Sequence, residues 1–256
     1  LAVLERALKT RRLVLENRDF KQRLEDGDPA ARMLFGTSPL SEELRARVRA
    51  VAPTMAEVLV AGPAGSGISK VAEVIHLMSP RAQAPFVKSP SAGLTTVDFA
   101  DLCLQAGDGS LFLDEISALS EALQYAVLEH IEQGGEPRLI AGSTADLAEL
   151  VAQGSFGADL YYRLEGMRGR IPALAERPGD IPVLFRLYVA QAAEQAGIEA
   201  PEISQEQLAA LMAQDWPGNA RSLMSAAMRF VLGMPDEVNA TAELGLAEQL
   251  AQVERS

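Results

Sequence analysis

The fold is decided by the stretch Gly62-Pro63-Ala64-Gly65-Ser66-Gly67-Ile68-Ser69. It lies between an apolar run at 58–61 and a helical pattern at 70–78. A strand, a turn with three glycines and a helix start direct backbone N–H groups and a helix dipole toward an anion, usually a nucleotide phosphate. The spacing is that of the phosphate-binding loop G-x-x-x-x-G-K-[ST]. Ile68 replaces its lysine, whereas Ser69 keeps the hydroxyl that binds magnesium.

The sequence around this loop alternates between strand and helix patterns, which predicts an α/β fold: a parallel sheet with helices on both faces. From Asp180 onward the strand signals stop and three helical patterns predict a small all-helical domain, with Ser204 as an N-cap before Gln207. The predicted strands are 58–61, 85–88, 110–116 and 138–143, and the predicted helices are 41–51, 70–78, 97–104, 120–133, 146–153, 181–196, 204–214 and 220–232.

Composition excludes several classes of protein. The net charge of −12 argues against this segment gripping nucleic acid by itself, because such binding needs clustered Lys and Arg. A single Cys103 excludes a disulfide framework, and His76 and His130 are too few and too isolated for a zinc site. No apolar run approaches the roughly 20 residues of a membrane span. We therefore expect a soluble cytoplasmic protein that does not contact a membrane.

An acidic pair forms the second chemical feature of the sequence. Asp114 and Glu115 close the apolar segment Gly109-Ser110-Leu111-Phe112-Leu113. Ligands of nucleotide-binding α/β sheets lie beyond the carboxyl ends of the strands, so these acids are expected beside the glycine-rich loop. Asp114 would hold a hydrated magnesium ion, with Ser69, and Glu115 would polarise the attacking water.

Three blocks of sequence resemble one family, the AAA+ activators of sigma-54 RNA polymerase, the NtrC and DctD class of bacterial enhancer-binding proteins. Residues 109–116 resemble its Walker B segment, and Asp159-Leu160-Tyr161-Tyr162-Arg163-Leu164 resembles a later block. The third block, Trp216-Pro217-Gly218-Asn219-Ala220-Arg221-Ser222-Leu223, resembles its W-P-G-N-x-R-x-L segment. The match extends from about residue 34 to residue 233.

The resemblance implies a P-loop AAA+ domain followed by a helical lid, with ATP or ADP and magnesium as ligands. Arg163 matches an arginine finger that reaches a neighbouring subunit's nucleotide, and Arg221 matches the sensor II arginine. The implied nucleotide-binding and catalytic residues are Gly62, Gly65, Ser66, Gly67, Ile68, Ser69, Asp114, Glu115, Arg163 and Arg221.

The sequence departs from the family pattern at four places. Ile68 replaces the Walker A lysine, Gly157 replaces the first of two finger arginines, and Ser143-Thr144 replaces a Thr-Asn pair at sensor I. The long insertion with the G-A-F-T-G-A loop that touches sigma-54 is missing between Pro85 and Gly109. Loss of the ammonium removes a contact of roughly 1.5–3 kcal/mol, and finger residues are worth about 10³ to 10⁵ in rate. We therefore expect weak nucleotide binding and little or no hydrolysis.

The ends of the chain resemble the linkers of a response regulator. Residues 1–28 are expected to form a linker helix after a receiver domain, which a sensor kinase would phosphorylate. Its first 25 residues hold seven basic and four acidic side chains, a charge of +3, with Leu1, Leu4, Leu8 and Leu15 at helical spacing. A dimer seam and a solvated linker helix are both consistent with this pattern. The expected domains are this linker, an α/β subdomain at 29–175, a lid at 176–234, and a linker toward a DNA-binding domain at 235–256.

Three hypotheses for function follow. The first is a degenerate AAA+ core that joins a receiver to a DNA-binding domain, forms a dimer or ring, and acts on RNA polymerase without contacting sigma-54. The second is an active or slow ATPase with a modified phosphate grip that drives transcription activation. The third is a domain that binds nucleotide without turnover, so that nucleotide sets its oligomeric state.

Overall fold

A computed structural model describes residues 27–234 of the chain. It divides into two compact units, with the boundary between Ala173 and Leu174. The linker helices expected within 1–28 and 235–256 lie outside the described residues, except for positions 27 and 28. Within 27–234, no helix combines the length and apolar character needed to cross a bilayer.

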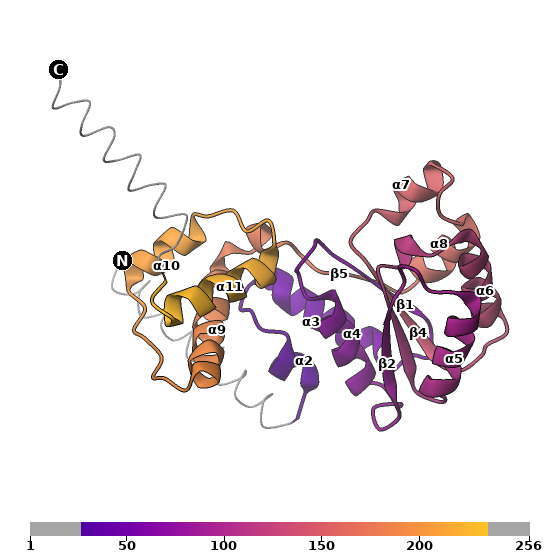
Figure 1. The fold of residues 1–256 in the computed structure, drawn as a ribbon, viewed down its shortest axis with the longest axis horizontal. Helices are drawn as coiled ribbons and strands as arrows, with labels where there is room; N and C mark the ends of the chain where they lie inside the picture. The colour runs from indigo at the N-terminus through magenta and orange to yellow at the C-terminus, as the bar shows by residue number, and fades with distance from the viewer. Residues whose placement is uncertain (1–26, 235–256) are drawn as a thin grey trace, which may run out of the picture. The chain divides into compact units, whose positions relative to one another are not determined.

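The first unit is built on a five-stranded parallel sheet, which confirms the predicted α/β fold (Figure 1). The strand order is β2-β3-β4-β1-β5, so β1, which leads into the glycine-rich loop, pairs with β4 and β5. The strands are β1 (Val58–Ala61), β2 (Phe86–Pro90), β3 (Ser110–Asp114), β4 (Arg138–Ser143) and β5 (Arg168–Arg170).

Two strand predictions needed correction. β3 ends at Asp114 and not at 116, because Glu115 has a left-handed backbone with φ 56° and cannot continue the strand. β5 was missed because its sequence, Arg168-Gly169-Arg170, has neither an apolar run nor β-branched residues.

Helices cover both faces of this sheet (Figure 1). On one face, the core formed by α3, α4 and part of α2 includes Val58 and Val60, and on the other face Leu59 joins the core formed by α5 to α8. Burial on both faces explains why β1 is apolar throughout. The helices are α2 (Pro29–Met33), α3 (Pro39–Val51), α4 (Ile68–Leu77), α5 (Thr96–Ala106), α6 (Glu121–Glu132), α7 (Leu147–Ala152) and α8 (Ala158–Glu165).

A buried arginine joins the sheet to α3. Arg138 is 4% exposed, and its guanidinium donates to the carbonyl oxygens of Val51 and Ala52, both at 2.9 Å, and of Ala56 at 3.0 Å. Carbonyl groups at a helix C-terminus have no partner within the helix, so one side chain satisfies several of them here. Burial, together with the charge of Arg81, lowers the pKa of Arg138 to about 10.

The two histidines occupy structural positions. His76 is buried, its ring stacks on Phe86 at 4.9 Å, and its Nδ1 lies 3.0 Å from Ser110 Oγ. Burial lowers the pKa of His76. His130 Nε2 lies 3.1 Å from the carbonyl oxygen of Pro137. Across residues 27–234, no group of three or more His, Cys, Asp or Glu side chains could hold a metal ion.

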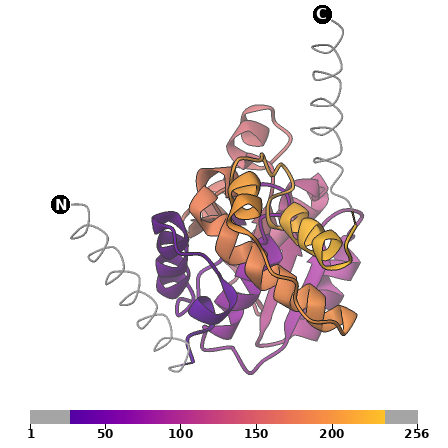
Figure 2. The same ribbon diagram turned by 90° about the vertical axis from the view of Figure 1, so that its left-hand side faces the viewer.

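The second unit is all-helical, as predicted. It contains α9 (Ile181–Ala196), α10 (Gln205–Met212) and α11 (Asn219–Val231), preceded by short 3₁₀ turns at Leu174–Glu176 and Pro178–Asp180. Ser204 caps α10 in a capping box with Gln207, as the sequence indicated. The helices α9 and α11, orange and yellow in Figure 2, pack side by side. The ring centroids of Phe185 and Phe230 are 5.7 Å apart.

Candidate functional site

The glycine-rich loop leaves β1 and opens α4. Gly67 is the N-cap of α4 with φ 100°, a backbone conformation that favours glycine, and its carbonyl accepts from the N–H groups of Lys70 and Val71. The loop is tied to the sheet because Gly62 N donates to the carbonyl oxygen of Ser143 on β4 at 3.2 Å. Ser66 Oγ is buried and has no hydrogen-bond partner within residues 27–234. These features are those of an anion cradle at a helix N-terminus.

The residue at the lysine position belongs to the hydrophobic core. Ile68 is 8% exposed and packs in the same cluster as Val60 and Phe112. Its Cγ2 lies so close to β4 that a Cβ added at Gly142 would be 2.8 Å from it. The absence of a side chain at Gly142 therefore gives Ile68 the space it occupies. Lys70, two residues later, is half-exposed and pairs with Glu73 at 3.5 Å.

Glu115 is fully engaged by the protein itself. Its Oε1 accepts from Ser117 Oγ at 2.6 Å, from Ser143 Oγ at 3.2 Å and from Thr144 N at 3.2 Å. Its Oε2 accepts from Thr144 N at 3.1 Å and from Thr144 Oγ1. Burial alone would raise the pKa of Glu115, but these hydrogen bonds outweigh it and hold the pKa below its ordinary value. The carboxylate is thus a fixed anchor between the ends of β3 and β4.

Asp114 and the loop lie at the same edge of the sheet, because β1 and β3 run parallel and end on the same side. Asp114 is the exposed last residue of β3, and its carbonyl accepts from Ser91 N at 2.9 Å. Ser143 connects the two parts of the site, because its carbonyl binds Gly62 N and its hydroxyl donates to Glu115. Asp114 and the half-buried Ser69 carry the oxygen atoms that could bind magnesium.

The two predicted cationic residues, Arg163 and Arg221, belong to different units of the chain. Arg163 is on α8, is half-exposed, and its Nε is 3.8 Å from Glu57 Oε2. Arg221 is exposed on α11 in the second unit, so it is described within that unit alone. Arg163 is not part of the hydrogen-bonded cluster around the loop.

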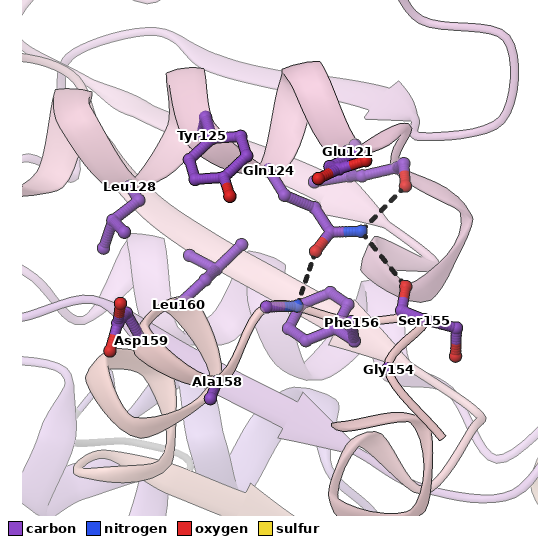
Figure 3. Close-up of a pocket in the computed structure, with 12 residues that line it drawn as sticks. Glu121, Gln124, Tyr125, Leu128, Gly154, Ser155, Phe156, Ala158, Asp159 and Leu160 are labelled. Atoms are coloured by element: carbon purple, nitrogen blue, oxygen red, sulfur yellow. Dashed lines mark hydrogen bonds between the residues drawn. The ribbon is translucent and has the colours of Figure 1, made fainter. Parts of the chain in front are cut away.

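A groove of about 430 Å³ has Gly157 among the residues that line it (Figure 3). Gly157 lies in the loop before α8, and its N–H donates to Gln124 Oε1 at 2.7 Å. Gln124 Nε2 donates to the carbonyl oxygens of Leu119 and Ser155, so one buried amide holds this loop against α6. The residues that line the groove include the acidic Glu121 and Asp159, and none of them is basic.

The structure thus brings together Gly62 to Ser69 with Asp114 and Glu115, and within the first unit it leaves Arg163 outside this cluster. The contributions of three residues were not predicted from the sequence. Ser143 and Thr144 bind Glu115, although they were considered only for the amide that they lack. Gly142 leaves space for the side chain of Ile68. A glycine inside an otherwise apolar strand is the sequence feature that could have indicated this close approach.

Comparison with known proteins shows the family to which this chain belongs. Residues 35–174 match the family described as Sigma-54 interaction domain, and residues 175–253 match the AAA+ ATPase lid domain. The regulatory protein DctD of Pseudomonas aeruginosa, which controls C4-dicarboxylate transport, is 37% identical over 260 residues, which cover 90% of this chain and 56% of DctD. NtrX of Azorhizobium caulinodans, a nitrogen assimilation regulatory protein, is 32% identical over 273 residues, with 94% and 59% covered.

Solved structures agree with these relatives. NtrX from Brucella abortus in complex with ADP has a TM-score of 0.72 at 31% identity and covers 89% of this chain and 56% of its own. The same protein in complex with ATP has a TM-score of 0.73 at 31% identity, with 91% and 57% covered. The chain spans little more than half the length of these relatives.

The parallel sheet, the glycine-rich loop after β1 and the helical second unit together define a P-loop AAA+ domain with its lid. Within that class, the chain belongs to the Sigma-54 interaction domain family, the central domain of transcriptional regulators.

Proposed function

We propose that this chain is a degenerate AAA+ core that serves a transcriptional regulator as a non-hydrolysing scaffold. It would oligomerise and transmit a signal from a receiver domain to a DNA-binding domain. The observation that carries the proposal is the burial of Ile68 in the core, where the family has a phosphate-binding lysine. An apolar side chain in this place supplies no charge to the β- and γ-phosphates.

The state of Glu115 supports the same conclusion. A residue that polarises an attacking water must offer a free carboxylate oxygen to it. Both oxygens of Glu115 are occupied by Ser117, Ser143 and Thr144. Activation of water at Glu115 would first require these hydrogen bonds to break.

The region between β2 and β3 argues against contact with sigma-54. β2 ends at Pro90, α5 covers Thr96–Ala106, and β3 begins at Ser110. This connection is a single capped helix, with Thr95 as the N-cap. It does not contain the long loop that the family uses. Any action on RNA polymerase would therefore use another surface.

A second function, nucleotide binding without turnover, is favoured by one observation. Ser66 Oγ is buried without a partner, beside the N–H groups that open α4. Buried hydroxyls are normally hydrogen-bonded, so this one suits a phosphate oxygen. Gly65, Ser66 and Gly67 would hold the phosphates, and Ser69 and Asp114 the magnesium ion. The nucleotide would then act as a ligand that sets the oligomeric state.

Calorimetry with ATP, ADP and magnesium, followed by steady-state phosphate release, separates these functions on the protein with its flanking domains. The scaffold proposal predicts no turnover. Measurable heat of binding without turnover supports the nucleotide-bound scaffold, and a silent titration leaves the nucleotide-free scaffold. Turnover at ordinary AAA+ rates overturns both and leaves the slow or active ATPase that drives transcription activation.

A further inference from the structure

The groove beside Gly157 has apolar walls and an exposed aromatic ring. Its volume of about 430 Å³ is that of a site which can hold a ligand or a side chain of a partner. Phe156 and Leu160 are buried where they line it, whereas Tyr125 is 66% exposed. Tyrosine is enriched at the cores of protein–protein interfaces, so an exposed ring over apolar walls has the character of a binding surface.

The groove also carries two carboxylates that the described residues leave unpaired. Glu121 and Asp159 are exposed, and within residues 27–234 the side chain of neither makes an ion pair or a hydrogen bond. In Figure 3, Asp159 lies toward one end of the groove and Glu121 toward the other, with Tyr125 and Leu160 between them. The groove therefore presents two separated negative charges on either side of an apolar centre.

The part of the chain that forms the groove is strongly acidic. Residues 89–162, which include all of the lining, hold twelve Asp and Glu and one Arg or Lys, Arg138. Arg138 is buried and donates to backbone carbonyls, so it does not neutralise the surface. Of the twelve carboxylates, Glu136 alone forms an ion pair among the described residues, with Arg81 at 3.3 Å. A groove lined by charge of one sign concentrates the field and attracts the opposite charge.

The loop that forms one wall of the groove is fixed, and glycine is not required by its backbone. Gln124 is 7% exposed and accepts from Gly157 N at 2.7 Å. Gly157 has φ −68°, which any residue adopts, and a Cβ there would meet only Gln124 Oε1, at an ordinary contact distance of 3.4 Å. The missing side chain at Gly157 therefore serves neither the turn nor the packing, and its effect is to leave the groove open.

We propose that this groove binds an extended segment of a partner protein, in which two arginines flank an apolar residue. One arginine pairs with Glu121 and the other with Asp159, and the apolar side chain contacts Leu160 between them. Arginine fits better than lysine, because its planar guanidinium binds a carboxylate through two parallel hydrogen bonds and stacks on a ring such as that of Tyr125.

Charge also favours a basic partner over a second copy of this chain. A second copy has the same net charge of −12, so its approach to the acidic groove is opposed by repulsion. The proposal is independent of whether the domain binds or cleaves nucleotide, because all residues that line the groove lie outside the glycine-rich loop and the acidic pair.

Peptide titration on the whole chain tests the chemistry of the occupant. The probe is a fluorescein-labelled peptide, Ala-Arg-Ala-Leu-Ala-Arg-Ala, which in an extended conformation places both arginines and the leucine on one side. The matched control peptide has citrulline in place of arginine and so keeps the shape without the charge. Fluorescence anisotropy should show that the arginine peptide binds about tenfold or more tightly than the citrulline peptide. Equal affinities would overturn the proposal.

Substitutions of the carboxylates locate the binding site. Glu121→Gln combined with Asp159→Asn should weaken binding of the arginine peptide by about tenfold or more, because both ion pairs are lost. The matched control, Glu132→Gln combined with Glu149→Gln, removes the same charge from exposed residues of α6 and α7 that do not line the groove. Its effect should stay below about twofold, as expected for distant screened charges. Equal weakening by the two pairs would show attraction to the acidic surface in general and would contradict the proposal.

Sedimentation of the whole chain distinguishes a partner from a second copy. A partner segment as occupant predicts that the Glu121→Gln and Asp159→Asn substitutions leave the oligomeric state unchanged, and that the arginine peptide does too. If the peptide and the substitutions both dissociated an oligomer, the groove would hold a second copy, and the proposal of a basic partner would be wrong.

Discussion

At the scale of single residues, the proposed scaffold role depends on two side chains, Ile68 and Glu115. Ile68 contributes apolar burial where a cation would be needed, and Glu115 contributes hydrogen bonds where a free base would be needed. Each change has its own energetic signature, so each can be tested by substitution.

Replacing Ile68 by Lys should destabilise the fold without restoring hydrolysis. Burial of an isoleucine side chain is worth about 1.5–3 kcal/mol, most of which the ammonium would lose. Turnover should stay absent, because Glu115 remains occupied. Urea unfolding and phosphate release measure the two properties, with Ile68→Met as a control that keeps volume and apolarity. An unchanged unfolding free energy in Ile68→Lys would show that the side chain is not part of the core.

Replacing Glu115 by Gln should lower the unfolding free energy by about 1.5–3 kcal/mol at pH 7, the value of hydrogen bonds to a charged group. The folded-state pKa of Glu115 is depressed, so its contribution is present above the unfolded pKa and is lost as pH falls through the folded value. The difference between the two proteins should therefore shrink in acid. Denaturation at pH 7 and below pH 4 measures this.

The neighbouring exposed carboxylate is the matched control. Asp114→Asn should change stability by less than about 0.5 kcal/mol, as exposed substitutions do. If Glu115→Gln proved equally mild at pH 7, the anchoring role of Glu115 would be wrong.

At the scale of elements, the contact between α4 and β4 is fitted around Ile68. A Cβ at Gly142 would lie 2.8 Å from Ile68 Cγ2 and 2.9 Å from Phe112 Cζ. Real Cβ atoms do not approach other atoms so closely, so either α4 or the ring of Phe112 would have to shift.

Gly142→Ala should therefore destabilise the domain by about 1–3 kcal/mol through overpacking. The substitution Ile68→Leu keeps the volume but removes the Cγ2 methyl that makes the contact, so the double variant should be more stable than the sum of the two single effects. A double-mutant cycle from urea unfolding gives the coupling. Strict additivity would show that these two residues do not share the space.

Arg138 joins β4 to the C-terminus of α3. Arg138→Met keeps the apolar stem but removes the donor to the carbonyls of Ala52 and Ala56, whereas the Val51 carbonyl still accepts from Thr54 N and Oγ1. Each buried unsatisfied group costs about 1–3 kcal/mol, so we expect a loss of roughly 2 kcal/mol or more. Thermal unfolding measures it, with Arg47→Met as the control, because Arg47 makes a single exposed bond to Arg168 O. Equal effects of the two variants would contradict the capping role.

At the scale of the whole molecule, the sequence predicts the class well. The glycine-rich loop, four of the five strands and the three lid helices follow from apolar runs and helical spacing. The failures have local causes. β5 has no apolar pattern, α2 is only five residues long, and α8 was quoted as a motif without being recognised as a helix.

The sequence predicted which residues of the first unit form the site, but it did not predict the contacts between their side chains. The loop and the acidic pair were placed at one edge because parallel strands end together. Side-chain contacts between β3 and β4, such as the bonds from Ser143 and Thr144 to Glu115, depend on strand register and on the left-handed backbone of Glu115, neither of which a sequence pattern reveals.

The central claim, that this domain does not cleave ATP, is tested most directly by a single-turnover experiment. The protein with its flanking domains is held in excess over γ-labelled ATP with magnesium, so that even one slow cleavage per site is counted. The account predicts that labelled phosphate appears no faster than in buffer alone. Release of phosphate well above that background, and its loss in Glu115→Gln, would contradict it.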